Sequence, residues 1–154
     1  LGTDNIIYTL FENNETLEVS GVLAGLGKEN ETIKAVRFMN DRGYVVTFEQ
    51  TDPLYTLDLS DPIEPKKVGE LSIPGYSSYL HIVDENRVLS IGRDANEGGE
   101  VLGLQIQLFD VSDFANPILA DKIQIGTHAT ESAAEYNHKA FTYRSSDMLF
   151  GIPY

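Results

Sequence analysis

The chain has 154 residues, and 42% of them are hydrophobic, which predicts one folded domain with a real core instead of a disordered chain. Its 24 Asp and Glu against 11 Lys and Arg give a formal net charge of −13, which would repel nucleic acid and anionic membrane surfaces. The absence of Cys excludes disulfides, Cys-ligated zinc and thiol catalysis.

The apolar runs of the chain are short, and the run 44–48 is far below the roughly 20 residues that span a bilayer, so we expect no membrane insertion. The sequence opens with LGTDNIIYTL, without an initiator Met and without a charged-then-apolar export signal. We therefore expect a processed protein or a part of a longer one, from which any export signal has been removed.

Strand patterns run along almost the whole chain. The segment 5–24, NIIYTLFENNETLEVSGVLA, predicts two strands. Turns rich in Asn and Asp at 40–43 and 84–86 each separate two strand patterns and predict tight hairpins. Between residues 33 and 125, strand-length apolar and alternating segments predict eight strands. They lie at 33–39, 43–49, 54–59, 67–73, 79–83, 87–92, 102–111 and 118–125.

The last quarter of the chain is less regular. TESAAEYNHKAF, residues 130–141, has mild helical character, and we expect a short helix there. The final segment, 137–154, again predicts two strands.

The stretch 55–75 recurs in altered form at 107–127, at an offset of 52 residues and without a gap. In both copies Ser-Asp follows a strand. The side chains of such residues accept hydrogen bonds from backbone N–H groups one or two residues later in the chain. A Pro then stands where the next strand begins, a position that needs no N–H donor. The identical pairs are Asp58/Asp110, Ser60/Ser112, Asp61/Asp113, Pro65/Pro117 and Ile73/Ile125.

A repeat of about 50 residues made of four antiparallel strands is typical of a β-propeller blade. We therefore predict an all-β fold in which the single segment 1–154 holds complete blades at 32–74 and 78–126 and half blades at 5–24 and 137–154. Three blades' worth of strands do not close a ring of ~4–8 blades. Either this chain is part of a longer propeller, which we favour, or two copies close a six-bladed ring as a homodimer, covering otherwise unpaired strand edges.

Over residues 5–154 the amino-acid sequence also resembles a known family, the secreted β-propeller domain family of bacteria and archaea. Its unit 57–75 is similar to LVIVD-type repeats. This resemblance implies a secreted or cell-surface protein with a parent chain several times longer. It implies no reaction and no catalytic residues. The stretches that carry it are VRFMNDRGYVVTFEQTDPLYTLDLSDPIEPKKVGELSIPGYSSYLHIVDENRVLSIGRDA, GLQIQLFDVSDFANP, HKAFTY and LFGIPY.

One loop, RDANEGGEVLGLQ, predicts a calcium site with Asp94, Asn96 and Glu100 as ligands. Alternating oxygen-bearing side chains and a Gly turn are typical of the first half of a calcium-binding loop. The twelfth position, where that pattern requires Glu, holds Gln105. A polar, Gly-rich connection between two strands is therefore the alternative interpretation.

The Ser, His and Tyr residues give weaker indications of a catalytic or binding site. No Ser lies in a G-x-S-x-G motif and no P-loop occurs, while the His residues have no metal-ligand spacing on one element and are expected to be structural. Three Tyr residues fall in inter-blade connections, where they would either bind a ligand or cover a blade edge. These residues are His81, His128 and His138, and Tyr76, Tyr79 and Tyr136.

The sequence thus supports two functions. The first is a non-enzymatic propeller segment of an exported protein, which acts as a scaffold or as a protein-binding surface. Its partners would be other proteins or the remainder of its own propeller. The second is a part of a hydrolytic or metal-dependent enzyme, whose active site lies in a propeller channel completed by blades outside this chain.

Overall fold

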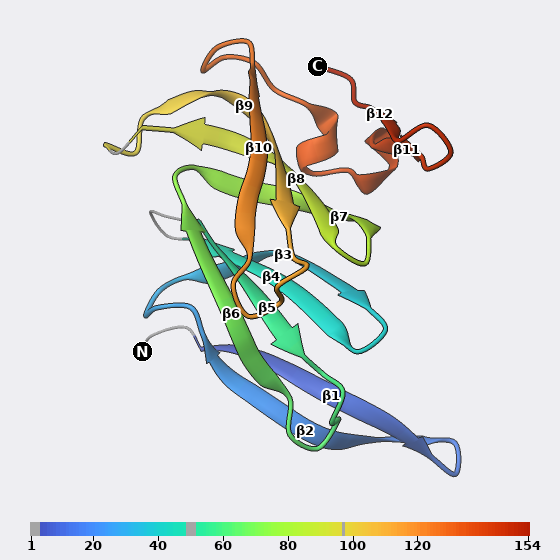
Figure 1. Ribbon diagram of the computed structural model, residues 1–154. Coiled ribbons are helices and arrows are strands. Elements are labelled where there is room, and N and C mark those ends of the chain that lie inside the picture. The colour runs from blue at the N-terminus through green and yellow to red at the C-terminus, as the bar shows by residue number, and fades with distance from the viewer. Residues whose placement is uncertain (1–3, 49–51, 97) are drawn as a thin grey trace.

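A computed structural model describes residues 4–48, 52–96 and 98–154 of the chain (Figure 1). No helix in these ranges is long and apolar enough to cross a membrane. The strands are β1 (Asn5–Asn13), β2 (Thr16–Leu26), β3 (Thr32–Met39), β4 (Arg42–Phe48), β5 (Asp52–Asp58), β6 (Lys66–Ile73), β7 (Tyr76–Asp84), β8 (Arg87–Ala95), β9 (Val101–Asp110), β10 (Ile118–Ile125), β11 (Thr142–Arg144) and β12 (Leu149–Gly151).

The strands form four antiparallel sheets that follow one another in chain order. Two sheets have four strands, β3-β4-β5-β6 and β7-β8-β9-β10, which we call blade one and blade two. The other two are the hairpins β1–β2 and β11–β12. The predicted fold class, two complete blades and two half blades, is therefore confirmed. Residue 49, the end of one predicted strand, lies outside the described residues.

The repeated Ser-Asp motif forms the turns that its sequence predicts. Asp58 Oδ1 accepts a hydrogen bond from the backbone N–H of Ser60 at 2.9 Å, and Asp110 Oδ1 accepts one from Ser112 at 2.8 Å. The strands β6 and β10 begin directly after the repeated Pro residues. The recurring acids are therefore part of the turn structure between the third and fourth strands of each blade.

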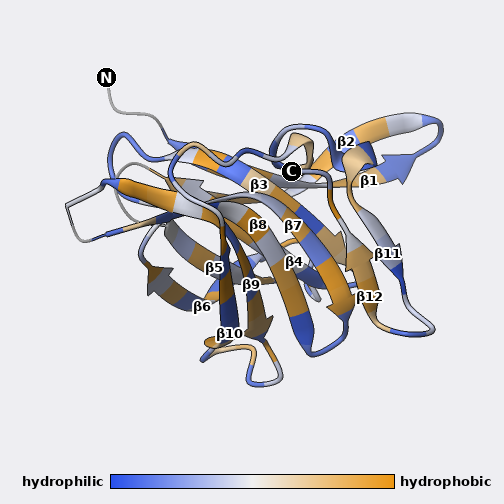
Figure 2. Ribbon diagram, turned by 90° about the horizontal axis from the view of Figure 1, so that it is seen from above, coloured by the Kyte–Doolittle hydropathy of each residue, from blue (hydrophilic) through white to orange (hydrophobic). Residues whose placement is uncertain are grey.

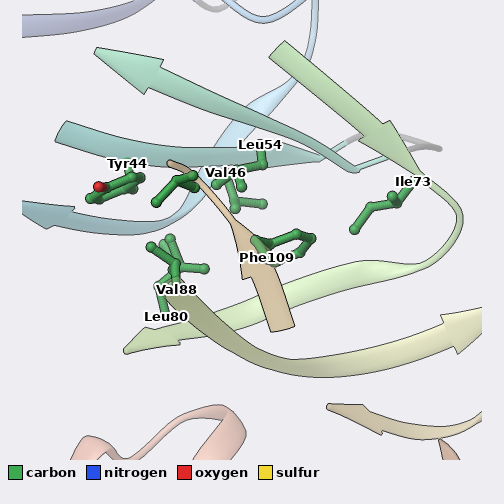
Figure 3. Close-up of a cluster of buried hydrophobic side chains, with 9 residues drawn as sticks. Tyr44, Val46, Leu54, Ile73, Leu80, Val88 and Phe109 are labelled. Atoms are coloured by element: carbon green, nitrogen blue, oxygen red, sulfur yellow. The ribbon is translucent and has the colours of Figure 1, made fainter. Parts of the chain in front are cut away.

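The central strands β4 and β8 are buried almost throughout, so both faces of each blade are covered along these strands. Apolar residues recur along the strands of both blades (Figure 2). Between the blades, Tyr44, Val46 and Leu54 of blade one point toward Val88 and Phe109 of blade two (Figure 3). A second cluster joins blade one to β1–β2, and a third joins blade two to the C-terminal segment. The result is a stack of four sheets with three apolar interfaces.

The blades approach each other through their first strands, since β3 contacts β7 (Figure 1). Such a stack, in which neighbouring sheets meet at one edge, is the arrangement of successive blades around a propeller axis.

The helix expected over 130–141 is not continuous. Two 3-10 turns, η1 (Ala133–Glu135) and η2 (His138–Ala140), occupy this segment. Ser132 caps the first turn and exchanges hydrogen bonds with Glu135, and Asn137 caps the second. Because Asn137 accepts a backbone hydrogen bond in the middle of the segment, it begins a new turn instead of extending the first.

Candidate functional site

The predicted calcium residues lie at the end of β8 and in the loop that follows it. Asp94 is buried, and its Oδ1 lies 2.9 Å from the Lys122 ammonium on β10. Asn96 Oδ1 accepts hydrogen bonds from the backbone N–H groups of Gly98 and Glu100, and Asn96 Nδ2 donates to Glu100 Oε2 at 3.1 Å. Residue 97, within the same loop, lies outside the described residues.

These contacts favour the alternative interpretation, a polar connection that is closed by its own hydrogen bonds. A cation at Asp94 would have to compete with the Lys122 ammonium. Within the described ranges, no group of three or more His, Asp or Glu side chains could hold a metal ion. Calcium binding stays a prediction, which melting in calcium and in chelator tests, because a ligand that binds only the folded state raises the midpoint.

His81 lies on β7 among aromatic rings. Its ring centroid is 4.7 Å from that of Phe141 and 4.8 Å from that of Tyr143, and its buried Nε2 has no hydrogen-bond partner in the described part of the chain. Burial lowers the pKa of His81, and the positive charge of Arg37 lowers it further. A neutral imidazole packed in this way acts as an aromatic core residue. His128 and His138 are exposed and lie on other segments, so the structure does not bring the three together.

The three Tyr residues do not form a common site. Tyr79 packs against Phe141 and lies under the Arg37 guanidinium, whose Cζ is 4.8 Å from the ring centroid. Tyr76 packs against Phe48 at 5.0 Å, and Tyr136 is exposed. Two of the three therefore belong to contacts between blades.

The best-defined polar feature is a contact that repeats between sheets. In blade one, Thr56 of β5 pairs across the strands with Gly69 of β6. The Thr56 hydroxyl donates to the carbonyl oxygen of Phe114, 2.6 Å away in the turn of blade two. A Cβ added at Gly69 would lie 2.7 Å from the same oxygen and 2.8 Å from that of Ala115, so only Gly lets the turn approach.

The same contact joins β1–β2 to blade one. Thr9 of β1 pairs with Gly21 of β2, and its hydroxyl donates to the carbonyl oxygen of Pro62 in the turn of blade one. A Cβ at Gly21 would lie 2.5 Å from that oxygen. We call this arrangement the Thr–Gly pair: each one receives the turn between the third and fourth strands of the following blade.

Sequence reasoning missed the Thr–Gly pairs, because only one of the two aligned copies has one. At the equivalent position of blade two, Leu108 pairs with Asp121. In the gapless alignment of the two copies, Thr56 is replaced by Leu108 and Gly69 by Asp121. These two differences were the sequence signal that could have pointed to the pair.

A hollow of about 210 Å³ lies beside this Leu–Asp position, between blade two and β11–β12. Its walls are mostly apolar. The residues that form it include Leu89, Ile106, Leu108, Ile123, Tyr143 and Phe150.

The comparisons with known proteins agree with this architecture. A family model described as a beta propeller domain matches residues 2–154. An uncharacterized protein of Archaeoglobus fulgidus is 45% identical over 150 residues, which are 97% of this chain and 22% of the relative. An uncharacterized protein of Methanocaldococcus jannaschii is 42% identical over 149 residues, with the same coverage of 97% and 22%. The chain therefore spans about a fifth of the length of these curated relatives, and it belongs to the beta propeller domain family.

Proposed function

We propose that this chain is a non-enzymatic propeller segment of a secreted or cell-surface protein, and that it acts as a scaffold that presents a protein-binding surface. The observation that supports it most is the repeated inter-blade contact. Asp and Thr are residue types that can take part in catalysis, but here the recurring Asp and Thr side chains hold turns and neighbouring sheets in place. A rigid stack held in this way is suited to carry a binding surface.

The charge of the chain favours basic proteins as partners. A net charge of −13 raises the encounter rate with basic proteins and opposes binding to nucleic acid. We therefore propose that the scaffold binds proteins with a basic contact surface, and that this binding weakens as salt is added, since salt screens exposed charges.

The test uses the full-length Archaeoglobus fulgidus relative, which is 45% identical to this chain. Protease treatment of intact cells checks the location, and cross-linking on the cell surface followed by mass spectrometry identifies partners. Reproducible capture of a partner that is released by salt supports the proposal.

The same protein is screened with hydrolase substrates and for bound metal. A protected intracellular location, or turnover of a substrate by the full-length protein, would overturn the proposal and favour the channel enzyme instead.

A further inference from the structure

The sequence contains two sites of the form Asn-x-Thr, the acceptor motif of N-linked glycosylation in exported proteins. One is 14–16, in the turn that joins β1 to β2, and the other is 30–32, which ends in the first residue of β3. Such a short motif also occurs by chance, so the structure around each Asn decides whether it is a usable acceptor.

The first site is exposed throughout. Asn14 and Glu15 form the two-residue turn of the hairpin, and strand pairing continues as far as the pair of Asn13 and Thr16. All four residues are exposed, and the turn lies at the far tip of the hairpin (Figure 1). Because the tip of a paired hairpin lies at the rim of its sheet, a sheet packed on either face leaves the outer side of this turn in solvent.

The backbone of this turn is strained at its second residue. Asn14 has a φ of 48° and Glu15 has a φ of 67°, both in the left-handed region. Asn tolerates this region, but a two-residue turn of this kind favours Gly at its second position, and Glu fits poorly there. The strain lowers the free-energy cost of opening the turn, so an enzyme can bind the motif in an extended conformation.

The second site is held by the fold, although Asn30 itself is exposed. Its middle residue, Glu31, is 2% exposed and accepts a buried hydrogen bond of 2.5 Å from the Thr47 hydroxyl. Asn5 Nδ2 donates to the Glu31 carbonyl oxygen at 2.9 Å. An enzyme that binds the segment 30–32 in an extended conformation has to break these contacts, so the folded chain protects Asn30.

We infer that Asn14 is an N-glycosylation acceptor and that Asn30 is not. This inference goes beyond the proposed function and rests on its cell-surface location, because N-linked glycans are attached to exported proteins. The donor is an oligosaccharide linked to a lipid phosphate, and a transferase that reads the Thr16 hydroxyl catalyses the step. Asn14 Nδ2 gives a proton to a base of the transferase and forms a bond to the anomeric carbon of the first sugar. The bond from that carbon to the phosphate oxygen breaks, and the lipid phosphate leaves with the electron pair.

The first test reads the two sites separately, since trypsin cuts after Lys28 and after Lys34. The full-length protein is purified from the surface of the cells that make it, and its tryptic peptides are measured by mass spectrometry. The peptide that ends at Lys28 contains Asn14 and should carry the added mass of a glycan. The peptide 29–34 contains Asn30 and should have the mass of its sequence alone. An unmodified Asn14 in the surface protein, or a glycan on Asn30, would overturn the inference.

Variants of the full-length protein, made in the same cells, check that the motif is what the transferase reads. Thr16→Ser keeps the hydroxyl and should retain the glycan, whereas Thr16→Val keeps the β-branched shape and should lose it, as Asn14→Gln does. The matched control Thr32→Val, at the second site, should migrate on a gel like the wild type. Retention of the glycan by Thr16→Val would contradict the inference.

The location of the protein is measured separately, by protease treatment of intact cells. A protein at the cell surface without a glycan on Asn14 overturns this inference and leaves the scaffold proposal in place. A protected intracellular protein overturns the proposed function and this inference with it.

Discussion

The two faces of blade two differ in how completely they are covered. On the face toward blade one, Val88 and Phe109 are fully buried, and Ser90 donates a buried hydrogen bond of 3.0 Å to Gln107. On the face toward β11–β12, Ile91 on β8 and Leu104 on β9 are fully buried, but Ile123 on the outer strand β10 is exposed. The same strands thus show that alternation decides which residues face outward from a sheet, while the neighbouring sheet decides whether they are buried.

The difference extends to polar contacts. On the face of blade one toward blade two, the pair Thr56 and Gly69 receives a turn, whereas Leu108 and Asp121 stand at the equivalent position of blade two. The variants below either break the complete interface or compare it with its open equivalent.

The largest effect is expected from Phe109→Ala in the complete interface. Truncation of this fully buried ring leaves a cavity between the blades and should lower the free energy of unfolding by about 3–5 kcal/mol. Urea denaturation measures the change. Ile63→Ala, at an exposed position in the turn of blade one, is the control and should change it by less than about 0.5 kcal/mol. A loss below about 1 kcal/mol for Phe109→Ala would mean that the blades do not pack as described.

Gly69→Ala tests the close approach of the turn of blade two. The added methyl group would lie within 2.8 Å of two carbonyl oxygens, so we expect a loss of about 1–3 kcal/mol in the free energy of unfolding. The matched variant Asp121→Ala, at the equivalent exposed position of blade two, should stay within about 0.5 kcal/mol of the wild type. Since Ala normally stabilises a strand relative to Gly, a stability gain for Gly69→Ala would rule out the contact.

Thr56→Val removes the hydroxyl of the pair and keeps its shape. The carbonyl oxygen of Phe114 loses its donor, and the free energy of unfolding should fall by about 1 kcal/mol. Thr9→Val at the exposed pair should cost less, because water can replace the hydroxyl at the Pro62 carbonyl. Equal losses for the two variants, measured by thermal and urea unfolding, would contradict this account.

The smallest effect is expected from acid. Hydrogen bonds from the Ser60 side chain and backbone lower the pKa of Asp58, and those from Ser112 lower the pKa of Asp110 in the same way. A carboxylate with a lowered folded-state pKa stabilises the fold above its unfolded pKa, near pH 4, and this contribution is lost as the pH falls through the folded-state pKa. The double variant Asp58→Asn, Asp110→Asn should therefore show a flatter decline of melting temperature between about pH 4 and pH 2. An unchanged slope would show that these bonds do not form in solution.

Much of the local structure could be predicted from the sequence. The strands, the hairpins and the Ser-Asp turns depend on residues close together in the chain, and they form where the alternation and the turn residues indicate. The helix over 130–141 failed for an equally local reason, the cap at Asn137. Calcium binding stays a prediction, and the ion pair of Asp94 with Lys122 could not be read from the loop sequence, since the two residues lie 28 positions apart.

The sequence by itself determined the blade: its period of strands, its turns and the alternation that gives each sheet two apolar faces, because these follow from backbone geometry and from neighbouring residues. Only the tertiary structure decided which of those faces is covered and which Thr and Gly meet a turn. Such contacts join residues more than 50 positions apart, as Thr56 and Phe114 are, and their energy depends on the approach of two sheets.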